Sequence, residues 1–177
     1  YVLDIPKRPE HALTGSGFVA QASGMNLVDR EAAVVREILA GNVPSFSRTL
    51  RAVKFNQTVQ ARAYEVTLFA SCDYLAVGSY QVHVFGSFLP SSAQSLAHKL
   101  NCSLPTKKMV DEIYTNSEIT LVPQPIPPSE KMTTVEVFSQ HTDSIKQQLS
   151  FSGMNRSGTE IVAGHKKDII ISNRIYD

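Results

Sequence analysis

The feature that most restricts the fold is a long block of β-forming sequence between two helical regions. Residues 51–88 contain "RAVKF", "QARAYEVTLFA", "YLAVG" and "YQVHVFGSF", which are rich in β-branched and aromatic residues with stretches of alternation. We predict two to four antiparallel strands here. The strands are grouped instead of alternating strictly with helices. This order favours a single α+β domain, a mainly antiparallel sheet with helices packed on it, over a doubly wound fold.

Helical periodicity surrounds this block. In "NLVDREAAVVREILAGN" (residues 26–42) Asn26 can cap a helix and Gly41 stands where a left-handed residue ends one. The spacing predicts that this helix turns one apolar stripe inward, formed by Val28, Ala32, Val35 and Leu39. Further helices are predicted in residues 14–24, after Ser92, after Thr106 and over residues 134–149, with a short helical turn after Pro44.

The remaining segments are connections and edges. Residues 1–12, with Pro6 and Pro9, read as an extended N-terminal arm, and residues 13–177 as one α+β domain. Four prolines make residues 123–130 a stiff, polyproline-like connection over the surface. "EITLVP" is a predicted strand, and "EIVAG" and "DIIIS" are predicted to close the chain as a hairpin.

Composition excludes several classes of protein. The chain has 177 residues, is 42% hydrophobic and 19% charged, and carries a formal charge of +1, which is typical of a globular domain. A charge so close to zero excludes the basic field of a nucleic-acid binder. No apolar run approaches the roughly 18 residues needed to span a membrane. We therefore expect neither a nucleic-acid partner nor a membrane span.

Two features favour secretion. The triplets that begin at Asn56, Asn101 and Asn155 are N-glycosylation acceptors, more than chance would supply. Cys72 and Cys102 either form a disulfide, worth roughly 3–4 kcal/mol on the chain-entropy model, or are two small buried residues. Because a bridge at Cys102 would crowd a sugar on Asn101, that acceptor ranks last. We expect an extracellular protein.

Motifs for cofactors are missing from the sequence. It contains no HExxH, no CxxC pair, no EF-hand loop and no GxSxG elbow, and "TGSGFVA" lacks the third glycine of a dinucleotide fingerprint. We therefore predict no cofactor and no metal. Among the histidines, His98 is expected to face solvent on a helix, and His83 to point to the solvent face of its strand.

The strongest catalytic candidate is the turn "GHKKD". His165 there could act as a general base, with Asp168 fixing its tautomer and Lys166 or Lys167 stabilising an oxyanion. A turn rich in lysine and aspartate is also what solvation alone selects between two strands. On residues alone, the solvated turn is the favoured interpretation.

Five blocks of the chain, in order, carry a family resemblance. "ILAGNVPSF", "VTLFASCDYLAVGS", "NCSLPTKKMVDEIY", "LVPQPIPPSEKMTTVEVFSQH" and "IVAGHKKDIIISNR" resemble a family of uncharacterised, mainly bacterial proteins that are often predicted to be secreted. Members of that family continue with tryptophan, tyrosine and histidine motifs beyond the point where this chain, which has no tryptophan, ends. The resemblance therefore implies a secreted domain and no defined reaction.

These observations together predict a secreted interaction module that binds another protein chain or an extracellular glycan, with no catalysis by this chain alone. An unpaired strand edge in the C-terminal hairpin would place Ile169–Ile171 beside a protein partner or a second copy of the chain. The alternative is an extracellular hydrolase that uses the GHKKD turn, completed by residues beyond this chain.

Overall fold

The computed structural model describes residues 1–151 and 158–164. Their helices are α1 (Gly15–Ala22), α2 (Leu27–Leu39), α3 (Pro90–Lys99), α4 (Lys107–Thr115) and α5 (Val135–Phe151), with a 3-10 helix η1 (Ser45–Arg48). The strands are β1 (Leu50–Val59), β2 (Arg62–Ser71), β3 (Ala76–Gly78), β4 (His83–Phe85), β5 (Ile119–Thr120) and β6 (Val162–Ala163).

The predicted α+β class is confirmed, with strands grouped between helices in the chain. All four strands between residues 50 and 85 are antiparallel, as predicted, but they form two separate ladders, β1–β2 and β3–β4, instead of one sheet. A third pair, β5–β6, is parallel. The first half of the predicted closing hairpin is therefore strand β6, paired with β5, and "DIIIS" lies outside the described residues.

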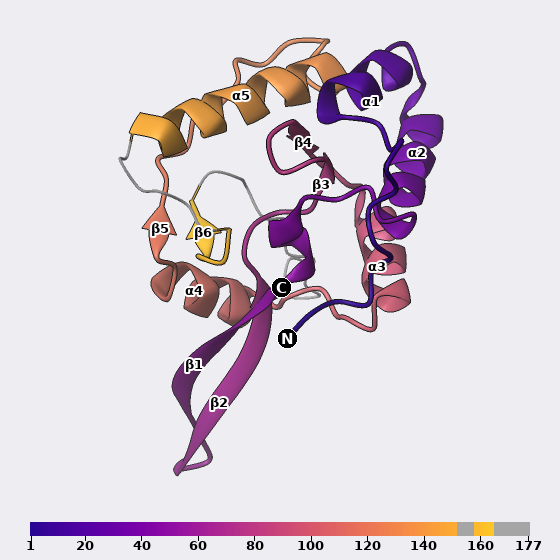
Figure 1. Ribbon diagram of the computed structural model, residues 1–177. Helices are drawn as coiled ribbons and strands as arrows, with labels where there is room; N and C mark the ends of the chain where they lie inside the picture. Colours follow the sequence, from indigo (N-terminus) through magenta and orange to yellow (C-terminus); the bar gives the residue numbers. More distant parts are fainter. Residues whose placement is uncertain (152–157, 165–177) are drawn as a thin grey trace.

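Helices surround the short β3–β4 ladder, while β1 and β2 extend away from the body as a long ribbon (Figure 1). α1 and α5 both contact β4, and α1 and α2 contact β3. The side chains between these elements form two adjacent apolar clusters, one including Phe18, Ile38, Val77 and Val84, the other Phe46, Phe85, Ile119 and Ile145. The core therefore surrounds β3–β4, and the ribbon meets it only at its base.

Helix α2 has the predicted limits but a different inward face. Asn26 caps it by accepting from the Asp29 backbone at 3.0 Å, and Gly41 follows it with a φ of 87°. Of the predicted stripe, Val28 is 74% exposed and Ala32 is exposed, while Val35 and Leu39 are half-buried against the core; the buried apolar residues are instead Ala33, Val34 and Ile38. Apolar residues occupy both neighbouring stripes of this helix, so its packing against β3 and α3, and not its periodicity, selects the buried one.

The other helices follow their predicted signals closely. α1 lies within the predicted residues 14–24. α3 starts at Pro90, before the predicted Ser92 cap, because proline suits the first helical position. Thr106 caps α4 as predicted. Residues 122–129, which contain the four prolines, form neither helix nor strand and are mostly exposed.

The N-terminal arm is attached to the body along its length. Val2 forms an isolated antiparallel bridge with Thr49, and the Leu3 backbone donates to the Arg48 carbonyl at 2.8 Å. Leu3 and Ile5 are both buried. The arm therefore runs beside η1, which forms one wall of the groove described next.

Candidate functional site

The residues of the predicted catalytic turn, His165, Lys166, Lys167 and Asp168, lie outside the described residues. The same holds for the acceptor Asn155 and for the predicted contact strand Ile169–Ile171. Their roles stay predictions. The described residues form a different candidate, a basic groove with a buried histidine behind one of its walls.

The groove lies between the N-terminal arm, η1 and the turn that joins β3 to β4. Its volume is about 510 Å³, which is in the range of small-molecule sites. Its lining combines cations, hydroxyl groups and apolar side chains: Lys7, Arg8, Arg48, Ser45, Ser79, Tyr80, Ile5 and Val43. No acidic side chain of the described residues lines it.

Backbone carbonyls and an amide hold Arg8 in place. Its Nε donates to Asn42 Oδ1 at 2.9 Å, and its Nη2 donates to the carbonyls of Ala12 and Leu13 at 2.8 and 2.9 Å. Asn42 is buried and in turn donates to Glu37 Oε2 at 2.7 Å. The guanidinium therefore has a fixed position, with its positive charge opposed only indirectly by Glu37.

Arg48 is held in the same manner from the other wall. Its Nη1 donates to the Ile5 carbonyl and its Nη2 to the Gly41 carbonyl, both at 2.7 Å. Burial lowers the pKa of Arg48 from its ordinary value, but a guanidinium keeps its charge at neutral pH. Because both partners are neutral carbonyls, Arg48 connects the arm to the end of α2 and adds an uncompensated charge to the groove.

The side chain of His83 is buried behind the groove, so the position predicted for it was wrong. We predicted this side chain on the solvent face of its strand, yet it is 9% exposed and lies edge-on to the rings of Phe46 and Phe85, with centroids 5.1 and 5.3 Å away. Alternation of side chains marks a solvent face only when one face of a strand is open. Here α1 and α5 both contact β4, so all three of its residues are buried.

The environment of His83 keeps its ring neutral. Burial, followed by the positive charge of Lys146, lowers the His83 pKa from 6.5 to about 4. Its Nδ1 lies 2.9 Å from the Tyr80 carbonyl, which only accepts, so Nδ1 carries the proton. Its Nε2 has no hydrogen-bond partner among the described residues. Through Tyr80, the ring supports the turn that forms one wall of the groove.

Lys146 fixes the other side of this histidine. From α5 its Nζ donates to the His83 carbonyl at 2.8 Å, and burial lowers the Lys146 pKa, which Asp143 partly opposes. The buried Asp73, whose Oδ1 accepts from the Tyr74 backbone at 2.8 Å, opposes the lowering of the His83 pKa. His83 lines neither the groove nor the smaller cavity, so this cluster positions the turn and has no access to a substrate there.

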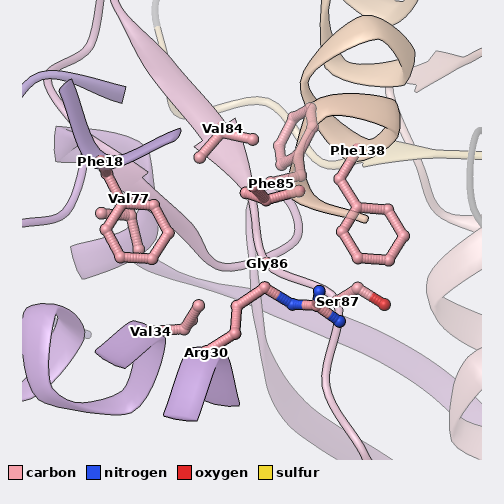
Figure 2. Close-up of a pocket in the computed structure, with 10 residues that line it drawn as sticks. Phe18, Arg30, Val34, Val77, Val84, Phe85, Gly86, Ser87 and Phe138 are labelled. Atoms are coloured by element: carbon pink, nitrogen blue, oxygen red, sulfur yellow. The ribbon is translucent and has the colours of Figure 1, made fainter. Parts of the chain in front are cut away.

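A second, smaller cavity lies between α1, α2, β4 and α5 and is mostly apolar. Figure 2 shows Phe18, Val77 and Val34 on one side and Phe138 on the other, with Arg30 reaching between them. The guanidinium carbon of Arg30 lies 5.8 Å from the centre of the Phe138 ring, in cation–π range. The cavity volume is about 10 Å³, room for roughly one water molecule, so it is a packing feature and not a ligand site.

The structure also places the other predicted residues, which are two glycosylation acceptors, the two cysteines and His98. Asn56 is exposed on β1, and Asn101 is exposed with a φ of 53°. The two cysteines are not bridged to each other, and the alternative of two buried residues holds for Cys72 alone: Cys72 is buried just after β2, whereas Cys102 is exposed after α3. The Cys72 thiol is 3.4 Å from the Thr49 and Thr159 carbonyls. His98 is exposed, as expected.

Sequence reasoning did not find the groove, because its cations come from positions 7, 8 and 48 and no motif joins them. Within residues 1–151 and 158–164, no cluster of three His, Cys, Asp or Glu side chains could hold a metal ion. No helix in this same part of the chain has the length and apolarity needed to cross a membrane.

Comparison of the chain with protein-family models, with curated proteins and with solved structures finds no match. The family resemblance of the five sequence blocks therefore stays a prediction, and the function must be argued from the geometry of this chain.

Proposed function

We propose that this chain is a secreted interaction module whose β1–β2 ribbon packs against the same ribbon of a second copy. The observation that carries the proposal is the ribbon itself, which projects from the body in Figure 1. Its two strands pair over their full ten residues, from Leu50 with Ser71 to Val59 with Arg62. At about 3.3 Å per residue, the ribbon is roughly 33 Å long.

The two faces of the ribbon differ in character. Cross-strand partners lie on the same face, and successive residues lie on opposite faces. One face is mostly apolar and is formed by the pairs Arg51–Ala70, Val53–Leu68, Phe55–Val66, Gln57–Tyr64 and Val59–Arg62. The opposite face is polar over its outer part, where it is formed by the pairs Lys54–Thr67, Asn56–Glu65 and Thr58–Ala63, and apolar at its base, where Ala52–Phe69 and Leu50–Ser71 lie.

Only the inner part of the apolar face is covered by this chain. At the base, Val53 packs in a small cluster with Ala70, Ile161 and Ile113 of α4. Towards the tip, Tyr64 is 48% and Val59 is 51% exposed. An isolated two-stranded ribbon is at best marginally stable in water, so a partner that covered this outer part would stabilise it.

A second copy of the chain is the partner with a matching surface. A two-fold axis would bring the same apolar patch of both copies together, and would bury the exposed Tyr64 and Val59 side chains of each. The acceptor Asn56 is on the opposite, polar face, so a sugar there would leave the contact open. The proposed contact is therefore compatible with a sugar on Asn56.

The alternative, an extracellular hydrolase, rests on His165 and Asp168, which are outside the described residues. The described residues add no support for it, because the buried histidine at position 83 lines neither of the two cavities described above. The interaction module is the function that the geometry supports best.

The experiment compares two neighbouring positions on opposite faces of the ribbon. Light scattering coupled to gel filtration, over concentrations around a Kd of about 1–100 μM, measures the mass of wild type, Tyr64→Lys and Ala63→Lys. Tyr64 belongs to the apolar face and Ala63 to the polar one. We expect a wild-type dimer, at least tenfold weaker association for Tyr64→Lys, and wild-type behaviour for Ala63→Lys.

Circular dichroism of both variants controls for unfolding. A wild-type mass equal to one chain at every concentration would overturn the proposed self-association. Equal association of the two variants would instead show that the dimer forms through another surface.

A further inference from the structure

We infer that the basic groove beside η1 is a binding site for an oxyanion, a carboxylate or sulfate group carried on a body about the size of a sugar ring. This inference goes beyond the proposed function, because it concerns a separate surface on the body of the molecule. It rests on the charges, the remaining hydrogen-bond donors and the lining of the groove.

The groove concentrates positive charge without a carboxylate to neutralise it. Lys7, Arg8 and Arg48 all line it, although the chain as a whole carries only +1. Among the described residues, none of these three side chains forms a salt bridge, whereas Arg51, Lys107 and Lys108 do. Partly buried positive charge that lacks an internal counterion favours an anion from outside.

The arginines are held in position by only part of their donors. Arg8 uses Nε and Nη2 for Asn42 and the backbone, so its Nη1 hydrogens have no acceptor among the described residues. Arg48 uses one donation from each Nη, which leaves Nε and the second Nη hydrogens. Arg48 keeps Nε and one hydrogen on each Nη, the donor types that form a planar fork for carboxylate and sulfate oxygens, whereas Arg8 offers the two hydrogens of Nη1 alone. The carbonyl contacts reduce the cost in entropy of ordering these side chains around a ligand.

The rest of the lining suits an uncharged, partly apolar body. Tyr80 contributes a partly exposed aromatic ring and Ser45 and Ser79 contribute hydroxyl groups, while the largely buried Ile5 and Val43 form an apolar floor. The Ser79 hydroxyl accepts from the Val82 backbone at 3.0 Å, which orders the turn beside the groove. A volume of about 510 Å³ accommodates one or two sugar rings and not only a bare ion. A sugar acid or a sulfated sugar combines both requirements.

The test measures binding of galacturonate, inorganic sulfate and glucose to the whole chain by calorimetry, at constant ionic strength set with sodium chloride. We expect galacturonate to bind with a Kd on the order of 1 mM or tighter, and glucose not to bind. Inorganic sulfate tests the oxyanion without a sugar ring attached. We expect it to compete with galacturonate, because both would accept hydrogen bonds from the same arginine donors.

Two exposed positions allow a negative charge to be introduced into the groove without substituting either arginine. Lys7→Glu and Ser45→Glu place a carboxylate in the groove, and both side chains are exposed. Each is expected to weaken galacturonate binding by at least tenfold. The matched control is Lys131→Glu, which reverses the charge of an exposed lysine that does not line the groove.

The inference would be overturned by any of three results. These are no binding of galacturonate or sulfate to wild type, equal binding of glucose, and unchanged affinity in both groove variants. Weakening by the Lys131→Glu control as large as that by Lys7→Glu would also overturn it, because the effect would then follow net charge and not the groove. None of these results depends on the oligomeric state, so they are independent of the ribbon proposal.

Discussion

The buried histidine should make the stability of this protein fall in acid by a measurable amount. In the folded chain the His83 pKa is about 4, against 6.5 in the absence of its surroundings. Between these values the unfolded chain binds a proton that the folded chain does not. Stability therefore rises with pH in this window. The contribution is fully present above about pH 6.5 and is lost as the pH falls through the window towards 4.

Linkage converts this difference in pKa into a free energy. Relative to neutral pH, His83 alone should lower the free energy of unfolding by about 1 kcal/mol at about pH 5.5 and by about 2 kcal/mol at about pH 4.5. Carboxylates also titrate at acidic pH, so the prediction concerns the difference between wild type and a variant that cannot take up this proton.

The assay is urea unfolding followed by circular dichroism at pH 7, 5.5 and 4.5, on wild type and His83→Gln. At pH 7 the variant should be less stable, because the ring contacts of His83 with Phe46 and Phe85 are lost. On going to pH 4.5 this deficit should shrink by about 2 kcal/mol, because glutamine has no proton to bind. The matched control is His98→Gln, which replaces an exposed histidine. If wild type and His83→Gln lose stability in parallel, the reasoning is refuted.

Two further pairs of variants test the fold. Gly41→Ala should lower the free energy of unfolding by more than about 2 kcal/mol, because its φ is +87° and the added Cβ would lie 2.2 Å from the Pro6 carbonyl oxygen. Gly24→Ala is the matched control: its φ is +79° but no atom lies within 4 Å of the added Cβ, so it should cost only about 1 kcal/mol. Equal losses in thermal melts would remove the steric argument. In α2, Val34 is buried and Val28 is exposed, so in urea unfolding Val34→Ala should cost about 1–2 kcal/mol and Val28→Ala under about 0.5 kcal/mol. The reverse order would mean that the stripe predicted from periodicity, and not the observed one, faces the core.

Local signals in the sequence predicted most of the secondary structure. Asn26 and Thr106 cap their helices through hydrogen bonds to backbone only a few residues away, so the information needed is local. Gly41 ends α2 because its φ of 87° is open to glycine. The β-forming block likewise produced antiparallel strands, which short turns can join without a crossover.

Tertiary contacts decided which face of each helix or strand is buried and which strands pair with one another. The inward stripe of α2 depends on which neighbours pack against it, and both stripes are apolar enough to be chosen. The same cause placed His83 inside: its strand has helices on two sides, which alternation in three residues cannot reveal. Division of the strands into three ladders depends on where β6 returns in space, more than forty residues after β5 in the chain.

The sequence by itself determined where helices and strands form, through caps, glycines and residue preferences that act within a few positions. The tertiary structure alone decided which of these elements share a core, and it brought Arg8 and Arg48 to one groove. The physical reason is range. Hydrogen bonds that cap a helix are closed by neighbours in the chain, whereas the groove is closed by contacts between distant segments, Arg48 with the Ile5 carbonyl and Arg8 with Asn42.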